Sequence, residues 1–148
     1  METILTEKLW NYIVNNNPEL MFNLQESYSV MTYLKEKIEG IHGLIQRLNY
    51  QNLPMDLIEE LCMDELTKEL KPSRYNFIRN IFERQFTEKA QMLKEHGTLT
   101  YEIINILISC EGIFRQLGFA GEEEKDRMLR ITVTDRIECH LKREKESV

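Results

Sequence analysis

The chain has 148 residues and a formal net charge of −6, with 42% hydrophobic and 30% charged residues. This length suits one ordinary domain, and the composition excludes a disordered chain. The acidic balance disfavours general binding to nucleic acid or to anionic membranes. No apolar run approaches the roughly 20 residues of a membrane span, and three cysteines without a CxxC pair argue against a disulfide framework. We therefore expect a cytoplasmic protein with no membrane association.

Glycine and proline are scarce in the sequence, with 6 and 3 occurrences. Sandwiches and barrels need many turns, and turns use these residues. The scarcity favours long helices with short connections. We predict an all-α fold, a compact multihelical array of about six helices in a single domain over residues 1–148. No internal repeat is apparent, and no linker is long enough to divide the chain.

In chain order, the first predicted helix covers residues 3–14, where Leu5, Leu9 and Ile13 recur every fourth residue, and it ends at the Asn-rich run before Pro18. The second and longest covers residues 25–48, where apolar residues recur at the spacings of a bundle seam. Gly40 and Gly43 lie inside this helix and are interpreted as positions of close packing or of a slight bend. The seam consists of Leu24, Tyr28, Met31, Leu34, Ile38, Ile41, Ile45 and Leu48.

The middle of the chain predicts three more helices. Pro54 suits the start of a helix that reaches about Leu70, and Ser73 caps the next helix, which runs to about Glu95. The helix over residues 100–117 is the most apolar, so it is expected at the centre of the fold together with the helix over 25–48.

The last predicted helix opens at the acidic run 122–124, which complements the positive end of the helix dipole. Residues 131–134 are β-branched and would also suit a strand. Apolar residues four apart, from Leu129 to Leu141, favour the helix. The charged tail over residues 142–148 is expected to fray.

No residue constellation indicates catalysis, a metal or a cofactor, so the prediction is a non-enzyme with none of these sites. The three histidines are widely dispersed, and zinc motifs need paired ligands. Glu138, Cys139 and His140 are adjacent in sequence, so on a helix they point about 100° apart. A cysteine nucleophile at Cys110 or Cys139 would need a histidine that the fold brings close.

Residues 66–81 are typical of a helix-turn-helix, with a short turn and a second helix capped by Ser73. Five basic and two acidic residues lie between Leu66 and Phe86, a local excess of positive charge. The candidate DNA contacts are Arg74, Tyr75, Asn76 and Arg79.

Three features oppose this interpretation. The turn carries Lys71 and Pro72 where such motifs usually have glycine and an apolar residue. The preceding stretch, residues 56–65, is acidic, although the first helix of such a unit lies across the phosphate backbone. Arg79 and Glu83 stand four apart and can pair with each other. We therefore prefer a structural interpretation of the pattern.

The run Leu70-Lys71-Pro72-Ser73-Arg74-Tyr75 resembles a family of small, acidic, multihelical proteins of unknown function from anaerobic gut and oral bacteria, often found near mobile elements. That family has a similar Leu followed by Ser-x-Tyr at the junction of two central helices. Gln85-Phe86 and Pro18-Glu19-Leu20 are also similar to its motifs. The resemblance implies an all-helical fold and assigns no catalytic or binding residue.

The leading functional hypothesis is a non-catalytic protein–protein interaction or regulatory module, with an unknown protein partner or a second copy of the chain. Val30 and Tyr33 lie off the main apolar stripe of their predicted helix, and a second apolar patch often marks a partner contact. The alternatives are the helix-turn-helix DNA binder over residues 66–81 and an enzyme of unknown class.

Overall fold

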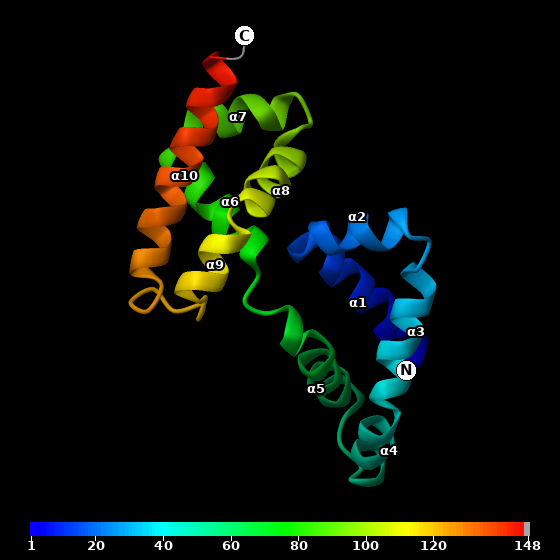
Figure 1. The fold of residues 1–148 in the computed structure, drawn as a ribbon. Helices are drawn as coiled ribbons and strands as arrows, with labels where there is room; N and C mark the ends of the chain where they lie inside the picture. The colour runs from blue at the N-terminus through cyan, green and yellow to red at the C-terminus, as the bar shows by residue number, and fades with distance from the viewer. Residues whose placement is uncertain (147–148) are drawn as a thin grey trace. The chain divides into compact units, whose positions relative to one another are not determined.

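The computed structural model describes residues 1–146, and their regular structure is entirely helical (Figure 1). The all-α prediction is confirmed over this range. Contacts divide the chain into two compact units, unit 1 over Met1–Lys71 and unit 2 from Pro72 onward, and the single domain over residues 1–148 stays a prediction. Among the described helices, none is long and apolar enough to cross a membrane.

Unit 1 is built from five α-helices and a short 3-10 turn. Its core contains the first predicted apolar stripe, because Leu5, Leu9 and Ile13 are all fully buried. These side chains pack against residues of the third, fourth and fifth helices, which include Ile38 and Ile58. The elements are α1 (Glu2–Asn16), α2 (Pro18–Glu26), α3 (Val30–Gly40), α4 (His42–Tyr50), α5 (Met55–Thr67) and η1 (Lys68–Leu70).

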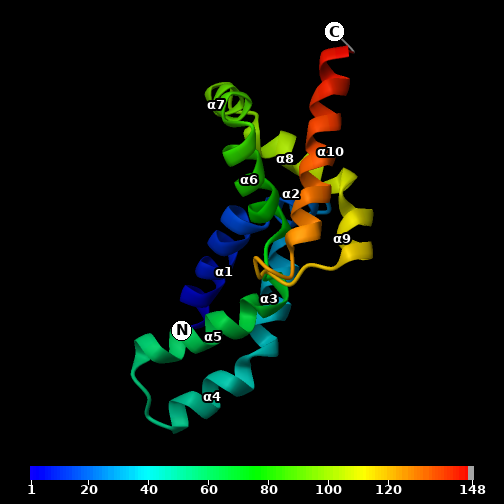
Figure 2. The ribbon, with the colours of Figure 1, turned by 90° about the vertical axis from the view of Figure 1, so that its left-hand side faces the viewer.

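Unit 2 is also built from five α-helices, around a core centred on Phe82 and Phe114. Its last helix contributes Val133 and Ile137, both fully buried, so the four-residue period correctly predicted helix over strand. Figure 2 shows this last helix running alongside α6. The elements are α6 (Arg74–Gln85), α7 (Thr87–Glu95), α8 (Leu99–Ser109), α9 (Glu111–Leu117) and α10 (Arg127–Glu146).

The prediction of about six helices was wrong, because three predicted helices are interrupted. The helix predicted over 25–48 breaks after α2 and again at Ile41, between α3 and α4. The helix predicted from Ser73 to Glu95 breaks at Phe86, and the one over 100–117 breaks at Cys110. Ile41, Phe86 and Cys110 are not themselves glycine or proline, although Gly40 and Gly43 flank the break at Ile41.

The helices of unit 1 correspond in order to those of unit 2, with α1 to α5 matching α6 to α10. The main helix–helix contacts correspond as well. In unit 1, α1 packs on α2, α3 and α5, and in unit 2, α6 packs on α7, α8 and α10. The pairs α2·α3, α3·α4 and α4·α5 likewise match α7·α8, α8·α9 and α9·α10.

The interruptions between helices recur at a constant spacing of 69 residues. Asn17 ends α1 with φ −135° and ψ 56°, and Phe86 ends α6 with φ −129° and ψ 50°. Ile41 and Cys110 make the single-residue breaks after α3 and α8, with φ of −106° and −94°.

The turns after α2 and α7 repeat in their hydrogen bonds. Ser29 N–H donates to the Leu24 carbonyl, and Thr98 N–H donates to the Leu93 carbonyl, at 2.9 Å in both units. Each bond spans five residues and closes over a residue with positive φ, Tyr28 in one unit and Gly97 in the other. Both turns are therefore Schellman motifs.

The same spacing aligns similar sequence. Gly43–Leu48 reads GLIQRL and Gly112–Leu117 reads GIFRQL, with a glycine, two apolar residues, a Gln/Arg pair and a leucine at matching positions. For the last helix of each unit, α5 and α10, the spacing is 71 residues, as the matching buried residues Leu66 and Ile137 show. The expectation of no internal repeat was wrong, and the chain contains two versions of one five-helix plan.

Several finer predictions also need correction. Tyr28 and Met31, placed in the apolar seam, are 95% and 70% exposed. A side chain added at Gly40 or Gly43 would meet nothing within 4 Å, so close packing was wrong, while the alternative of a bend agrees with the break at Ile41 that these glycines flank.

The final helix differs from the prediction at both ends. It begins at Arg127, because residues 123–126 form turns and the buried Asp126 carboxylate accepts the backbone N–H groups of Ala120 and Gly121. The tail expected to fray from residue 142 is helical to Glu146, and residues 147–148 lie outside the described range.

Candidate functional site

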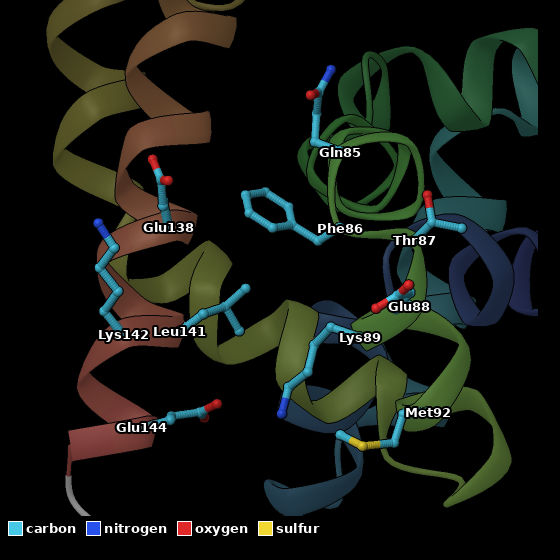
Figure 3. A pocket seen from close by; sticks show the side chains of 10 residues that line it. All are labelled: Gln85, Phe86, Thr87, Glu88, Lys89, Met92, Glu138, Leu141, Lys142 and Glu144. Carbon is cyan, nitrogen blue, oxygen red and sulfur yellow. The ribbon is translucent and has the colours of Figure 1, made fainter.

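Unit 2 contains a groove of about 960 Å³ between the start of α7 and the last turns of α10. Phe86 and Leu141 point into it from opposite sides, and Met92 closes one end (Figure 3). Phe86 and Leu141 are half-buried against the core of the unit. The groove therefore has an apolar floor that is anchored in the fold. Its rim carries polar and charged residues: Gln85, Thr87, Glu88, Lys89, Glu138, Lys142 and Glu144.

The break between α6 and α7 places Phe86 in this groove. Its non-helical φ and ψ turn the chain, and its carbonyl accepts the Ala90 N–H at 2.9 Å, so Phe86 serves as the N-cap of α7. Leu141 lies one turn beyond the buried Ile137 on α10 and continues the buried stripe of that helix. The floor is thus formed by one residue at a helix break, Phe86, and one on the buried stripe of α10, Leu141.

The corresponding place in unit 1 is bridged by a polar side chain. Asn17 takes the position of Phe86, and Leu70 takes that of Leu141. The Asn17 side-chain amide donates to the Leu70 carbonyl at 3.4 Å, and Asn17 is only 8% exposed. A buried polar side chain bridges the two elements here, whereas unit 2 leaves an open apolar surface.

Next to the groove, three side chains converge from two helices: Glu102 on α8, and His140 and Glu144 on α10. We call this set the acidic corner. His140 Nε2 lies 2.7 Å from Glu102 Oε1 and 3.4 Å from Glu144 Oε1. The Glu102 side chain is 14% exposed and that of His140 is 26% exposed. One potential ligand atom from each of the three residues lies within 4.8 Å of the others.

The surroundings of the acidic corner raise the pKa of Glu144. Burial raises the pKa of Glu144, and the hydrogen bond and negative charge of Glu102 raise it further. The positive charges of His140 and Lys89 act in the opposite direction. The two carboxyl groups and the imidazole therefore lie close enough to influence one another.

Unit 1 fills the equivalent corner differently. Tyr33 occupies the position of Glu102, and Glu69 occupies that of His140. The Lys37 ammonium lies 3.3 Å from Glu69 Oε2 and 5.6 Å from the centre of the Tyr33 ring. A lysine cation thus neutralises the single carboxylate of this corner.

Two of the candidate DNA contacts are engaged inside unit 2. Tyr75 is 3% exposed, and its hydroxyl donates to Thr100 Oγ1 at 3.3 Å. The Arg74 guanidinium lies 4.9 Å from the centre of the Phe114 ring. Tyr75 therefore belongs to the core, and Arg74 covers an aromatic side chain.

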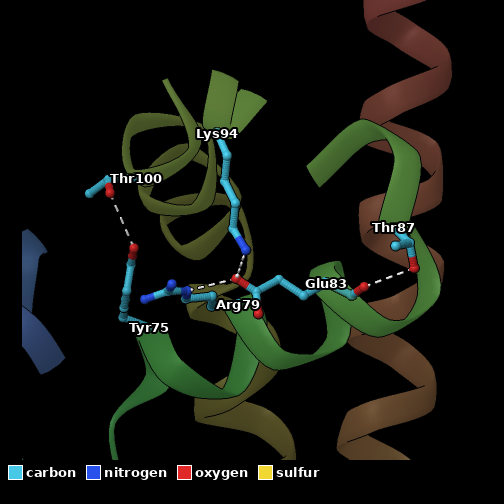
Figure 4. Close-up of polar contacts among 6 residues, drawn as sticks. All are labelled: Tyr75, Arg79, Glu83, Thr87, Lys94 and Thr100. Atoms are coloured by element: carbon cyan, nitrogen blue, oxygen red, sulfur yellow. Dashed lines mark hydrogen bonds and ion pairs between the residues drawn. The ribbon is translucent and has the colours of Figure 1, made fainter. Parts of the chain in front are cut away.

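Arg79 is also engaged by a neighbour. Its Nε donates to Glu83 Oε1 at 2.9 Å, and Lys94 Nζ lies 3.2 Å from the same oxygen (Figure 4). The expected Arg79–Glu83 pair is confirmed. The hydrogen bond from Arg79 lowers the pKa of Glu83, and Lys94 lowers it further.

The remaining candidate, Asn76, is exposed, and its N–H donates to the Ser73 side chain at 3.0 Å, which confirms the predicted cap. Residues 66–70 belong to unit 1, while α6 belongs to unit 2. The two predicted helices of the helix-turn-helix therefore lie in different units.

Val30 and Tyr33, the candidate partner contacts, are half-buried and pack against the core of unit 1. Burial raises the pKa of the Tyr33 hydroxyl. The charge of Lys37 lowers this pKa by a smaller amount, and the charge of Glu69 raises it. The more exposed apolar residue on the same helix is Met31. A partner contact at Val30 and Tyr33 stays a prediction.

The cysteines give little basis for nucleophilic chemistry. Cys62 and Cys110 are buried, and burial raises the pKa of both thiols. A buried neutral thiol is a poor nucleophile. Cys139 is exposed, and its neighbour His140 is directed to Glu102 on another helix.

No family model matches the sequence, and no curated protein or solved structure matches it. The resemblance to the multihelical bacterial family therefore stays a prediction.

Sequence reasoning missed the residues that distinguish unit 2. The spacing of His140 and Glu144, four apart on one helix, was a usable signal, because such residues share a face. Their third partner, Glu102, lies 38 positions away from His140 and is brought close by packing alone. Phe86 was predicted as one more apolar residue inside a continuous helix.

Proposed function

We propose that the chain is a non-catalytic interaction module whose unit 2 binds an amphipathic helix of a partner protein. The observation that carries the proposal is the apolar groove at Phe86, Met92 and Leu141 of unit 2, whose matching place in unit 1 is bridged by Asn17. Helix-in-groove recognition uses a floor of this kind, with apolar anchors spaced along one face of the partner helix.

Charge specifies the partner further. The rim carries Glu88, Glu138 and Glu144 against Lys89 and Lys142, and the chain as a whole has a net charge of −6. Complementary charge around an apolar anchor speeds association and excludes wrong partners. The favoured partner helix therefore has apolar anchors and a basic flank, and an acidic second copy of this chain is a poorer occupant.

The proposal places the protein in a reducing cytoplasm, where its three free cysteines remain thiols. DNA binding is the weaker alternative, because Tyr75 is in the core and Arg79 is bound to Glu83. Fluorescence anisotropy with a DNA duplex at low and at physiological salt tests this alternative. Salt-sensitive binding that is lost in Arg79→Ala would favour it.

The direct test of the groove is a selection of helical peptides on the full chain, followed by affinity measurements on variants. Met92 is 39% exposed, so Met92→Glu places a charge in the groove without disturbing the core. Met31→Glu is the matched control, because Met31 is an exposed methionine on α3 of unit 1.

We expect the selected peptides to combine apolar residues at helical spacing with lysine or arginine. Met92→Glu should weaken their binding by about 2 kcal/mol or more, the loss typical of an anchor contact, and Met31→Glu should leave it unchanged. Peptides that bind Met92→Glu as tightly as the unchanged protein would contradict the proposal.

A further inference from the structure

We propose that the acidic corner, Glu102, His140 and Glu144, is a binding site for one divalent transition-metal ion of the zinc type. The inference goes beyond the proposed function, because the corner is formed by its own three side chains and does not need a partner in the groove. Among the described residues, it is the one group of three metal-ligating side chains that converge in this way.

The donor set suits such an ion. An imidazole nitrogen with two carboxylate oxygens is a mixed set that Zn²⁺ accepts at about 2.0–2.2 Å, and ligand atoms around one tetrahedral ion then lie roughly 3.3–3.6 Å apart. The separations of His140 Nε2 from the two carboxylate oxygens are 2.7 and 3.4 Å. Small side-chain rotations therefore bring the three atoms to ligand spacing.

The elements that carry the ligands are well anchored. Glu102 stands next to the fully buried Ile103 on α8, and His140 follows the fully buried Ile137 on α10. His140 and Glu144 lie one helical turn apart, a spacing that puts two ligands on the same face. Because α8 and α10 belong to the same unit, its fold presents the three side chains together.

Electrostatics favours a cation at this position. Glu102 is mostly buried and stands beside the carboxyl group of Glu144, and two carboxylates in one place repel each other. A bound dication offsets this repulsion. In unit 1 the equivalent corner already contains a cation, because the Lys37 ammonium lies beside Glu69. In unit 2 the position of Lys37 is taken by Ile106, which has no charge.

The competing explanation is that His140 only hydrogen-bonds to Glu102 and Glu144 and that the cluster is structural. The two explanations differ in what added metal does. A bound metal takes the place of these hydrogen bonds at the His140 Nε2 atom, whereas a purely structural cluster shows no binding at one equivalent.

The experiment uses the full chain without an affinity tag, in a Cys139→Ser background that removes the exposed thiol beside the site. The protein is stripped with a chelator and titrated with ZnCl₂, then with MnCl₂, by isothermal calorimetry at neutral pH. Nitrogen-15 NMR follows the His140 ring in the same titration. We expect one Zn²⁺ per chain, weaker Mn²⁺ binding, and a shift of the His140 ring signal at one equivalent.

His140→Ala and Glu102→Gln should each weaken Zn²⁺ binding by about 100-fold or more, because removal of a direct ligand exceeds the 10–100-fold effect of a supporting residue. Glu144→Gln, at a half-exposed position, gives the same test without risk to the core. The controls are Glu138→Gln on α10, and His42→Ala, which removes an exposed imidazole that pairs with Glu2.

The site is disproved if Zn²⁺ leaves the His140 ring signal unchanged, or if Glu144→Gln binds Zn²⁺ as tightly as the parent. Equal losses in His42→Ala would assign the binding to general surface imidazoles and would also overturn the proposal. Peptide binding in the groove is measured separately with the stripped protein, so failure of the metal site and failure of the groove give different results.

Discussion

Units 1 and 2 share one backbone plan but differ in how two equivalent places are filled. Asn17 bridges to Leu70 in unit 1, and Phe86 faces Leu141 across an open groove in unit 2. Lys37 neutralises Glu69 in the corner of unit 1, and two carboxyl groups face His140 in unit 2. The comparison teaches that the same two places hold side chains that contact each other in unit 1, whereas unit 2 has an apolar floor at one place and a histidine between two carboxyl groups at the other.

The largest expected effect comes from equivalent core positions. Ile13 and Phe82 match at the spacing of 69 and are both fully buried. Phe82→Ala should lower the free energy of unfolding by about 3–5 kcal/mol, and Ile13→Ala by about 2–5 kcal/mol, because each leaves a cavity. Denaturant titration measures the loss, and hydrogen exchange locates it.

Hydrogen exchange should place the lost protection of Phe82→Ala in α6–α10 and that of Ile13→Ala in α1–α5, since each side chain packs in the core of its own unit. Equal loss throughout the chain from either change would show that the two cores do not respond as separate units.

A second, smaller effect concerns the matching turns at Tyr28 and Gly97. Tyr28 is a non-glycine residue with φ 54° and is 95% exposed, so it carries backbone strain and little packing. Tyr28→Gly should stabilise the protein by about 1 kcal/mol, and Gly97→Ala should destabilise it by about 1 kcal/mol. If thermal unfolding shows a gain in stability for Tyr28→Gly and a loss for Gly97→Ala, the two turns are equivalent. A loss of stability in Tyr28→Gly would argue against equivalent turns.

The smallest expected effect comes from the Arg79–Glu83–Lys94 cluster of unit 2. Unit 1 has no equivalent cluster, because Val14 stands at the position that matches Glu83. The folded protein lowers the pKa of Glu83, so its contribution to stability is present above the ordinary value of 4.5 and is lost as the pH falls through the lower folded pKa. Glu83→Gln should destabilise by about 0.5 kcal/mol at neutral pH, because the pair is partly solvent-screened.

Near pH 3 the difference between Glu83→Gln and the unchanged protein should shrink, which urea titrations at the two pH values measure. A difference that stays constant with pH would mean that the Glu83 carboxylate charge contributes nothing.

Much of the fold was predictable because burial follows helical periodicity. The stripe Leu5, Leu9 and Ile13 is buried as its spacing implied, and Ser73 caps α6 as its side chain implied. The breaks at Phe86 and Cys110 were not predictable from these residues, because both are apolar and suit a helix interior. Phe86 leaves helical geometry with φ −129° and ψ 50°, and Cys110 stays nearer to it with φ −94° and ψ 0°.

The candidate site was less predictable than the fold. The argument that Glu138, Cys139 and His140 diverge on a helix was sound, but it considered neighbours in sequence only. The partners of His140 are Glu144, one turn further, and Glu102, on a helix that tertiary packing brings near. The groove likewise depends on a break at Phe86 that no local signal marked.

The central claim is that two copies of one plan are present, with equivalent breaks in both. Backbone NMR assignment of the full chain tests it most directly, because ¹³Cα shifts report helix and interruption residue by residue. The account predicts loss of helical shifts at residues 17 and 86, at 28 and 97, and at 41 and 110, each pair 69 apart. Uninterrupted helical shifts from residue 74 to 95 or from residue 99 to 117 would contradict it.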